Sequence, residues 1–276
     1  MAAMQATPLW RSRFVGMVRE YVEEEEQVRM DSVLITGGSR GIGRATALLA
    51  AEKGWSVAVN YVGDAAAAEA VTARITSIGK KAVALRGNVA AEADVLAMYD
   101  AAEQELGPLT GVVINAGIVA PPRPLVDIEA DRIRRIFEVN TLGAYLCARE
   151  AARRMARSRG GRGGAIVLVS SMAARLGSPL EYVDYAGSKA AVDALTVGLA
   201  KELGSEGVRV NAVRPGLIET EIHASGGQPD RARRLGASSP LGRAGRAEEV
   251  AEAIVWLLSD ASSYVTGSFI DVAGGR

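Results

Sequence analysis

Cysteine and histidine are almost absent from this chain of 276 residues, which contains one of each. A lone cysteine excludes an intramolecular disulfide, and one histidine with one cysteine cannot supply the ligands of a structural zinc site. The length suits one large domain or two small ones with a substantial core. We therefore expect a fold that needs neither a cross-link nor a metal.

Net charge and long apolar runs are also missing. The 32 basic side chains are balanced by 32 acidic ones, whereas a dedicated nucleic-acid binder needs an excess of positive charge. No run of about 18 apolar residues occurs, so no segment is long enough for a transmembrane helix. These observations predict a soluble, cytoplasmic protein with neither a nucleic-acid nor a membrane partner.

The first 29 residues differ from the rest of the chain. They lack the apolar stretch of a secretory signal and end near an acidic block, residues 23–26. The first twenty contain arginine and little acid, as transit peptides do, but we favour a mobile or loosely helical extension. The predicted organisation is an extension over residues 1–29 and one domain over residues 30–276.

Aromatic residues make up only 5% of the chain, although 49% of it is hydrophobic. The apolar residues are mainly Ala, Val, Leu and Ile, and short β-branched runs alternate with longer helical stretches. This alternation predicts a parallel sheet with helices on both faces, a doubly wound α/β fold. The seven expected strands span residues 32–36, 56–61, 82–85, 111–115, 165–170, 208–213 and 269–272. The expected helices span about residues 42–53, 65–78, 92–106, 127–157, 183–204 and 246–259, with Asp64 and Asp127 as N-caps.

A glycine-rich turn, TGGSRGIG at residues 36–43, joins the first expected strand to the first helix. Glycine removes the Cβ that would block both a tight turn and a close approach to a pyrophosphate. The amides at the start of the following helix then face the phosphates. We expect a dinucleotide to bind here.

The same turn also satisfies the G-x-S-x-G pattern of the α/β-hydrolases, with Ser39 as the nucleophile. That fold places several strands before its nucleophile, whereas Ser39 follows the first expected strand. The triad would also need His223, the only histidine, which lies in a loop. A serine hydrolase is therefore the less favoured alternative.

The end of the second expected strand bears on the choice between NAD and NADP. A carboxylate there would bind the ribose 2′-hydroxyl, but the segment reads Val59-Asn60-Tyr61, and Asp64 is better explained as a helix cap. Arg40 can instead pair with a 2′-phosphate. We predict that NADP(H) is favoured over NAD(H).

Tyr185 and Lys189 lie four residues apart at the start of an expected helix, so they share one face. An ordinary tyrosine pKa near 10 is too high for efficient proton exchange around neutral pH. A lysine ammonium about 4 Å away contributes roughly 4 kcal/mol, or about three pKa units, toward the phenolate. We therefore predict that Lys189 lowers the pKa of Tyr185.

With this turn and this pair, residues 30–276 resemble the short-chain dehydrogenase/reductase family, in particular its β-ketoacyl-reductase-like and glucose-dehydrogenase-like members. The turn matches the family's T-G-x-x-x-G-x-G, and Asn115-Ala116-Gly117 matches its N-A-G. Pro215-Gly216, followed by Thr220, matches the segment that closes over the nicotinamide. The resemblance implies a single catalytic domain of the Rossmann type.

The resemblance also implies a catalytic set: Asn140, Ser171, Tyr185 and Lys189. In it, the tyrosine exchanges a proton with the substrate, and the lysine lowers the tyrosine pKa and binds the nicotinamide ribose. The serine holds the substrate oxygen, and the asparagine holds a relay water. The expected cofactor-binding residues are Gly37, Ser39, Arg40, Gly41, Ile42, Gly43, Asn60, Tyr61, Asn88, Val89, Asn115, Ala116, Gly117, Tyr185, Lys189, Pro215, Gly216, Ile218 and Thr220.

Two positions depart from the family pattern. Ser171 and Tyr185 are 14 positions apart, one more than is usual, which leaves Ser170 as an alternative catalytic serine. Asn88-Val89 stands where many members have Asp-Val, although an asparagine can still bind adenine.

The predicted function is an oxidoreductase that transfers hydride between NADP(H) and a small carbonyl compound or secondary alcohol. The alternatives are a non-catalytic NADP-binding sensor or scaffold, and the hydrolase. Family analogy implies a homotetramer or homodimer. The substrate would be set by residues 172–184 and 217–241, where Met172, Tyr182, Leu217 and Ile218 suggest a partly apolar pocket.

Overall fold

A seven-stranded parallel sheet forms the centre of the computed structural model, which describes residues 31–276. The expected extension, residues 1–29, lies outside the described residues. The strand order is β3-β2-β1-β4-β5-β6-β9, so the predicted doubly wound fold is confirmed. The strands are β1 (Ser32–Ile35), β2 (Ser56–Tyr61), β3 (Ala82–Arg86), β4 (Gly111–Ile114), β5 (Gly164–Val169), β6 (Val208–Pro215) and β9 (Phe269–Val272).

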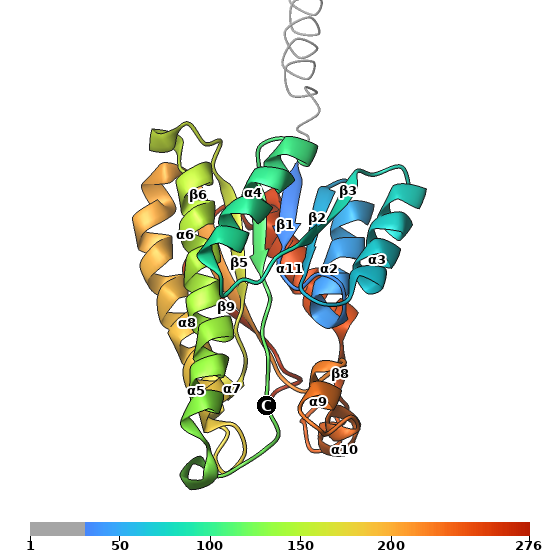
Figure 1. Ribbon diagram of the computed structural model, residues 1–276, viewed down its shortest axis with the longest axis vertical. Coiled ribbons are helices and arrows are strands. Elements are labelled where there is room, and N and C mark those ends of the chain that lie inside the picture. Colours follow the sequence, from blue (N-terminus) through green and yellow to red (C-terminus); the bar gives the residue numbers. More distant parts are fainter. Residues whose placement is uncertain (1–30) are drawn as a thin grey trace, which may run out of the picture. The chain divides into compact units, whose positions relative to one another are not determined.

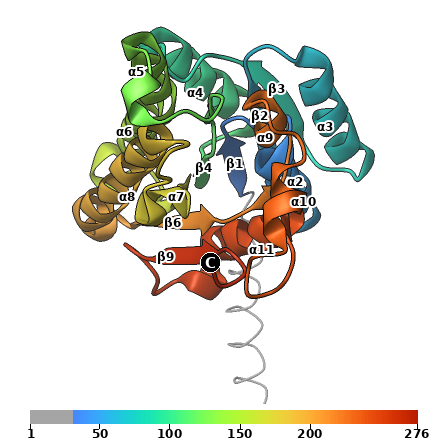
Figure 2. The same cartoon turned by 90° about the horizontal axis from the view of Figure 1, so that it is seen from below.

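Helices cover both faces of this sheet (Figure 2). One face carries α2 (Gly41–Glu52), α3 (Ala65–Ser77) and α11 (Ala247–Leu258). The other face carries α4 (Glu92–Leu106), α6 (Gly143–Met155) and α8 (Val183–Leu203). Side chains of one strand alternate between the two cores: Leu34 packs in the core under α4, α6 and α8, and Val33 and Ile35 pack in the other. Because both faces are covered, the central strands β1, β4 and β5 consist mostly of apolar residues.

The predicted helix over residues 127–157 is wrong as a single element. A short 3-10 turn, Leu125–Asp127, precedes α5 (Ala130–Phe137), and a π-helical turn, Glu138–Leu142, separates α5 from α6. Asp127 is therefore not an N-cap; Glu129 occupies that position without a side-chain bond. The apolar pattern continues through the π-turn, so it does not reveal the extra residue that this turn inserts.

The predicted cap at Asp64 is confirmed. Its side chain accepts a 2.9 Å hydrogen bond from the backbone N–H of Ala67 in the first turn of α3. The carboxylate satisfies one of the free amides at this helix start.

Small elements at the carboxyl end of the sheet were not predicted (Figure 1). They are α7 (Ala173–Leu176), β7 (Ile218–Glu219), α9 (Ile222–Ser225), α10 (Arg231–Gly236) and β8 (Gly245–Arg246). Each is shorter than two helical turns or a normal strand, so sequence periodicity does not mark it. Within residues 31–276, no helix has the length and apolarity needed to span a membrane.

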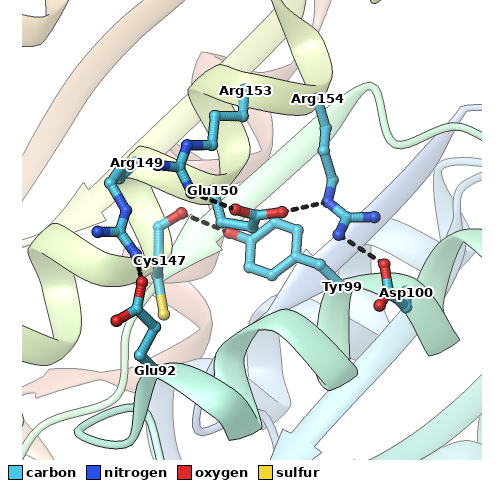
Figure 3. A network of polar contacts seen from close by, with 8 residues as sticks. All are labelled: Glu92, Tyr99, Asp100, Cys147, Arg149, Glu150, Arg153 and Arg154. Carbon is cyan, nitrogen blue, oxygen red and sulfur yellow. Dashed lines mark hydrogen bonds and ion pairs between the residues drawn. The ribbon is translucent and has the colours of Figure 1, made fainter.

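A partly buried charge network joins α4 to α6 (Figure 3). The Arg154 guanidinium contacts Asp100 and Glu103 of α4 at 2.7 Å each, and Glu150 of its own helix at 2.8 Å. It also lies 5.6 Å from the centroid of the Tyr99 ring. The Tyr99 hydroxyl, fully buried, donates to a backbone carbonyl of α6. Arg154 therefore pairs with three carboxylates at the contact between α4 and α6, two helices on the same face of the sheet.

We predict that Arg154→Ala lowers the free energy of unfolding by about 2 kcal/mol, because Glu150, 7% exposed, loses its best counter-ion. Arg153→Ala is the matched control: its side chain is 50% exposed and its ion pair with Glu150 is longer, 3.5 Å. We expect it to change the free energy by no more than about 0.5 kcal/mol. Urea unfolding measures the free energy of unfolding of both variants. Equal decreases would contradict the role of Arg154 as the main counter-ion of Glu150.

Candidate active site

A cleft of about 590 Å³ opens at the carboxyl ends of the strands. From β1 the strands β2 and β3 follow toward one edge of the sheet. The chain then returns to the other flank of β1, where β4, β5 and β6 follow toward the opposite edge. In open parallel sheets, the crevice at such a reversal of strand order is where ligands bind. The topology therefore places a binding site between the loops that follow β1 and β4.

The glycine-rich turn forms the inner wall of this cleft. Gly37 and Gly41 have φ angles of +63° and +52°, which residues with a Cβ rarely adopt. A Cβ on Gly43 would lie 2.3 Å from the carbonyl oxygen of Gly37, so α2 packs directly onto the turn. Arg40, the N-cap of α2, makes no side-chain capping bond, which leaves the first amides of the helix available to an anion.

Asn115 joins this turn to the end of β4. Its Nδ2 donates to the carbonyl oxygens of Thr36 and Gly37, at 2.8 and 3.0 Å. In return, the Thr36 hydroxyl accepts the backbone N–H groups of Asn115 and Ala116. These bonds fix the spacing of the two loops between which the cleft opens.

Asn60, near the end of β2, also binds the glycine-rich turn. Its side chain is 1% exposed, and its Oδ1 accepts the Gly37 N–H at 3.1 Å. Its Nδ2 donates to the carbonyl of Gly87, at 2.9 Å, after β3. The amide is therefore occupied by backbone groups, although the residue lines the cleft.

Tyr185 and Ser171 meet in the cleft. Burial raises the pKa of Tyr185, and a hydrogen bond with the Ser171 side chain lowers it by a smaller amount. Ser170 lies elsewhere: it is 2% exposed, and its hydroxyl donates to the carbonyl of Lys189. The geometry thus brings Ser171, not Ser170, to the tyrosine.

The amine of Lys189 lies beside the Tyr185 ring. Its Nζ lies 5.9 Å from the centroid of the Tyr185 ring and donates to the carbonyl of Val169 at 2.8 Å. Burial lowers the pKa of Lys189 itself to about 8. In this structure burial raises the pKa of Tyr185, and the predicted lowering of that pKa by Lys189 stays a prediction.

Asn140 lies in the π-turn between α5 and α6. Its Oδ1 accepts the N–H of Ile118 at 2.8 Å, and its Nδ2 donates to the carbonyl of the same residue at 2.9 Å. The Nδ2 also donates to the Ser188 hydroxyl at 3.1 Å. A Cβ on Gly117 would be within 3.4 Å of both Asn140 Oδ1 and Lys189 Nζ. The side chain thus anchors the loop after β4 beside the lysine.

Most of the residues expected at the site line this one cleft. Gly43 and Asn140 are the exceptions, since each packs behind the lining. The expected residues that line it are Gly37, Ser39, Arg40, Gly41, Ile42, Asn60, Tyr61, Asn88, Val89, Asn115, Ala116, Gly117, Ser171, Tyr185, Lys189, Pro215, Gly216, Ile218 and Thr220.

The structure adds residues that the sequence did not indicate. Arg135 and Glu138, at the junction of α5 and the π-turn, line the cleft, as do Arg231 and Arg276. They belong to segments far apart in the chain and to no recognised motif. Only the folded chain brings them together.

The arrangement does not form a hydrolytic triad. Ser39 and His223 both line the cleft, but His223 Nε2 lies 2.9 Å from the carbonyl of Ile218. Burial lowers the pKa of His223, so the ring is neutral at pH 7. In residues 31–276, no cluster of three or more His, Cys, Asp or Glu side chains could hold a metal ion.

The fold and the cleft are those of a nucleotide-dependent oxidoreductase, and residues 37–276 match the family model described as enoyl-(acyl carrier protein) reductase. The chain belongs to the short-chain dehydrogenase/reductase family, whose members are NAD(P)-dependent oxidoreductases of alcohol and carbonyl groups.

Its relatives include the uncharacterized oxidoreductase YgfF of Escherichia coli strain K12, 56% identical over 90% of this chain and 100% of that protein. The NADPH-dependent aldehyde reductase-like protein of Arabidopsis thaliana is 38% identical over 88% of this chain and 92% of its own. Among solved structures, a short-chain type dehydrogenase/reductase from Mycobacterium marinum superposes with a TM-score of 0.83 at 39% identity, covering 89% and 94% of the two chains.

We predict that Gly43→Ala lowers the unfolding temperature by about 2–8 °C, since the new methyl group must displace the turn. We also expect it to weaken dinucleotide binding, measured by fluorescence titration. Gly204→Ala is the control, because this residue has helical φ and ψ of −57° and −47° and open space around it. A Gly43→Ala protein as stable and as tight-binding as Gly204→Ala would contradict the role of the turn.

Proposed function

We propose that the protein is an NADP(H)-preferring oxidoreductase that transfers hydride between the nicotinamide and a small carbonyl compound or secondary alcohol. The observation that carries the proposal is the convergence of Ser171, Tyr185 and Lys189 on the cleft that the glycine-rich turn also lines. A dinucleotide-binding turn and proton-exchanging side chains in one cleft are what such a reaction requires.

The residues of the cleft fit a dinucleotide. The free amides at the start of α2 and the close backbone approach at Gly37 suit the pyrophosphate. Asn88 and Val89 would face the adenine; the Asn88 Oδ1 accepts the N–H of Ala90, which leaves its Nδ2 for the base. Pro215, Gly216, Ile218 and Thr220 would lie along the nicotinamide end. When bound, NADP(H) supplies or accepts the hydride.

The side chains of this protein would then handle the proton. Tyr185 stays protonated at neutral pH because burial raises its pKa, so it is suited to donate a proton to a carbonyl oxygen. Ser171, hydrogen-bonded to it, would hold the same oxygen. Lys189 is mostly charged below about pH 8 and would bind the ribose. Asn140 would act by fixing the loop beside the lysine and a relay water.

Two features support a preference for NADP(H). Arg40 is exposed at the N-cap of α2, lines the cleft, and pairs with no carboxylate of residues 31–276. Asp64, the acid nearest the end of β2, is bound to the amide of Ala67. A guanidinium without a counter-ion favours a 2′-phosphate over a 2′-hydroxyl. The Arabidopsis relative also carries NADPH dependence in its name.

The substrate side of the cleft has mainly apolar walls, formed by Met172, Leu176, Tyr182, Leu217 and Ile222. These walls favour a small molecule with an apolar part next to the reacting carbonyl.

We further propose that the protein assembles as a homotetramer or homodimer. Light scattering measures the oligomeric state.

We predict that Tyr185→Phe abolishes carbonyl reduction, with a loss of about 10³-fold or more in kcat, since the proton donor is removed. NADPH oxidation at 340 nm with a panel of ketones and aldehydes measures the rate, and fluorescence titration measures cofactor affinity. We expect affinity to stay within about twofold, because only one hydroxyl changes.

Tyr182→Phe is the control for the loss of a phenol in the same cleft and should retain turnover. Substantial activity in Tyr185→Phe would overturn the assignment. Tight NADPH binding by the unmodified protein without turnover of any substrate would favour a nucleotide sensor instead.

We predict that Arg40→Ala raises the KM for NADPH by about tenfold or more and leaves the KM for NADH nearly unchanged, because only NADPH carries the 2′-phosphate. Arg44→Ala, on the next turn of α2, is the control for the removal of a nearby exposed charge. Parallel kinetics with the two cofactors measure the ratio. Equal effects on both cofactors would contradict the role of Arg40.

A further inference from the structure

Arg231 is a charged residue with little exposed surface on the segment that covers the cleft, residues 217–241, which we call the lid. It is the first residue of α10, lines the cleft, and is only 8% exposed. Its two terminal nitrogens donate to the two carboxylate oxygens of Glu181, at 2.8 and 2.5 Å. Its guanidinium carbon lies 5.0 Å from the centroid of the Tyr182 ring. One side chain therefore makes a bidentate ion pair and a cation–π contact.

The contact bridges two parts of the chain that no secondary structure joins. Glu181 and Tyr182 belong to the loop between α7 and α8, whereas Arg231 belongs to the lid, and Figure 2 shows α7 and α10 on different sides of the carboxyl end. On its own side, Arg231 also donates to the Gln228 side chain at 3.1 Å. The Arg231 guanidinium therefore binds one residue of the lid and one residue of the loop between α7 and α8.

The loop that receives Arg231 has an unfavourable backbone. Ser178 and Leu180 have φ angles of +44° and +64°, a region that residues with a side chain rarely occupy. Such conformations persist where the surroundings hold them, and they concentrate at ligand sites. Here the N–H of Arg123 donates to the carbonyl of Glu181 at 3.0 Å, and Arg231 binds the Glu181 carboxylate.

The same loop leads directly into the helix that carries Tyr185. Tyr182 precedes the first residue of α8, and Asp184 is held by Arg132 of α5 at 2.8 and 3.1 Å. Arg132 also donates to the carbonyl of Pro121 in the loop after β4. The start of α8 is therefore clamped from α5 by Arg132, and the loop before it is clamped from the lid by Arg231.

We propose that Arg231 is a positioning residue that latches the lid against Glu181 and Tyr182, shapes the substrate side of the cleft, and releases when substrate enters or product leaves. The proposal rests on the proposed function. Both latch partners precede the catalytic helix, so a closed lid also fixes the wall next to Tyr185. Lysine would not replace this arginine, because it lacks both the planar fork and the stacking surface.

The latch is tested on the full-length protein loaded with NADPH, by limited digestion with thermolysin, which cuts before apolar residues such as Leu235 and Leu241. We expect Arg231→Ala and Arg231→Lys to raise the rate of cleavage in the lid by about tenfold, since opening no longer breaks the ion pair. Arg233→Ala, an exposed arginine on the same helix, is the matched control and should behave as the unmodified protein.

Kinetics give the second readout. The probe is the ketone or aldehyde of the panel that the unmodified protein reduces fastest. We expect Arg231→Ala to raise the KM for this compound by about tenfold and to leave the Kd for NADPH within about twofold, a split that general destabilisation would not produce. Should Arg231→Ala fail to fold, Glu181→Gln removes the same charge pair from the other side and is judged by the same measures. Because the two residues act as one unit, the double variant should be no worse than Arg231→Ala alone.

Cleavage rates and KM values within about twofold of the unmodified protein, in both Arg231→Lys and Glu181→Gln, would overturn the latch. A protein that reduces no carbonyl compound would overturn the proposed function, while the cleavage rates would still decide whether Arg231 holds the lid. The two failures are therefore distinguishable.

Discussion

The site depends on the hydrogen bonds that Asn115 and Thr36 make between the ends of β1 and β4. β1 and β4 are neighbours in the sheet, and the strand order reverses between them. The loops that follow these two strands therefore lead away in opposite directions. Asn115 binds the carbonyls of Thr36 and Gly37, and Thr36 receives the amides of the loop after β4. These bonds lie above strands that are fully buried, and they join the two loops that line the cleft.

The remaining buried polar groups extend the same arrangement outward. Asn60 ties the glycine-rich turn to β3, and Asn140 ties the loop after β4 to α8 through Ser188. Each amide satisfies backbone groups that would otherwise be unpaired in a dry interior. The π-turn that carries Asn140 belongs to this pattern, since an extra residue in a helix re-aims one side chain, and such turns gather at functional sites. This polar support lies on the part of the cleft that the glycine-rich turn and the loop after β4 form.

The part of the cleft next to residues 217–241 is built differently. Its lid rests on short elements, apolar contacts and the Arg231–Glu181 pair rather than on the sheet. A family can keep the cofactor half and the proton-exchanging side chains while these loops vary, because loops tolerate change better than the core. Membership of the short-chain dehydrogenase/reductase family therefore establishes the class of reaction but not the substrate.

The amino-acid sequence by itself determined the sheet, the main helices, the glycine-rich turn and most of the residues that line the cleft. These are local properties: apolar alternation, a helix cap such as Asp64, and motifs of adjacent residues. Tertiary structure alone decided that the helix over residues 127–157 is interrupted, that Ser171 rather than Ser170 meets Tyr185, and that burial raises the pKa of Tyr185. It also decided that Arg231 reaches a carboxylate 50 residues earlier in the chain. Such outcomes depend on how segments remote in sequence pack against one another, which no local pattern encodes.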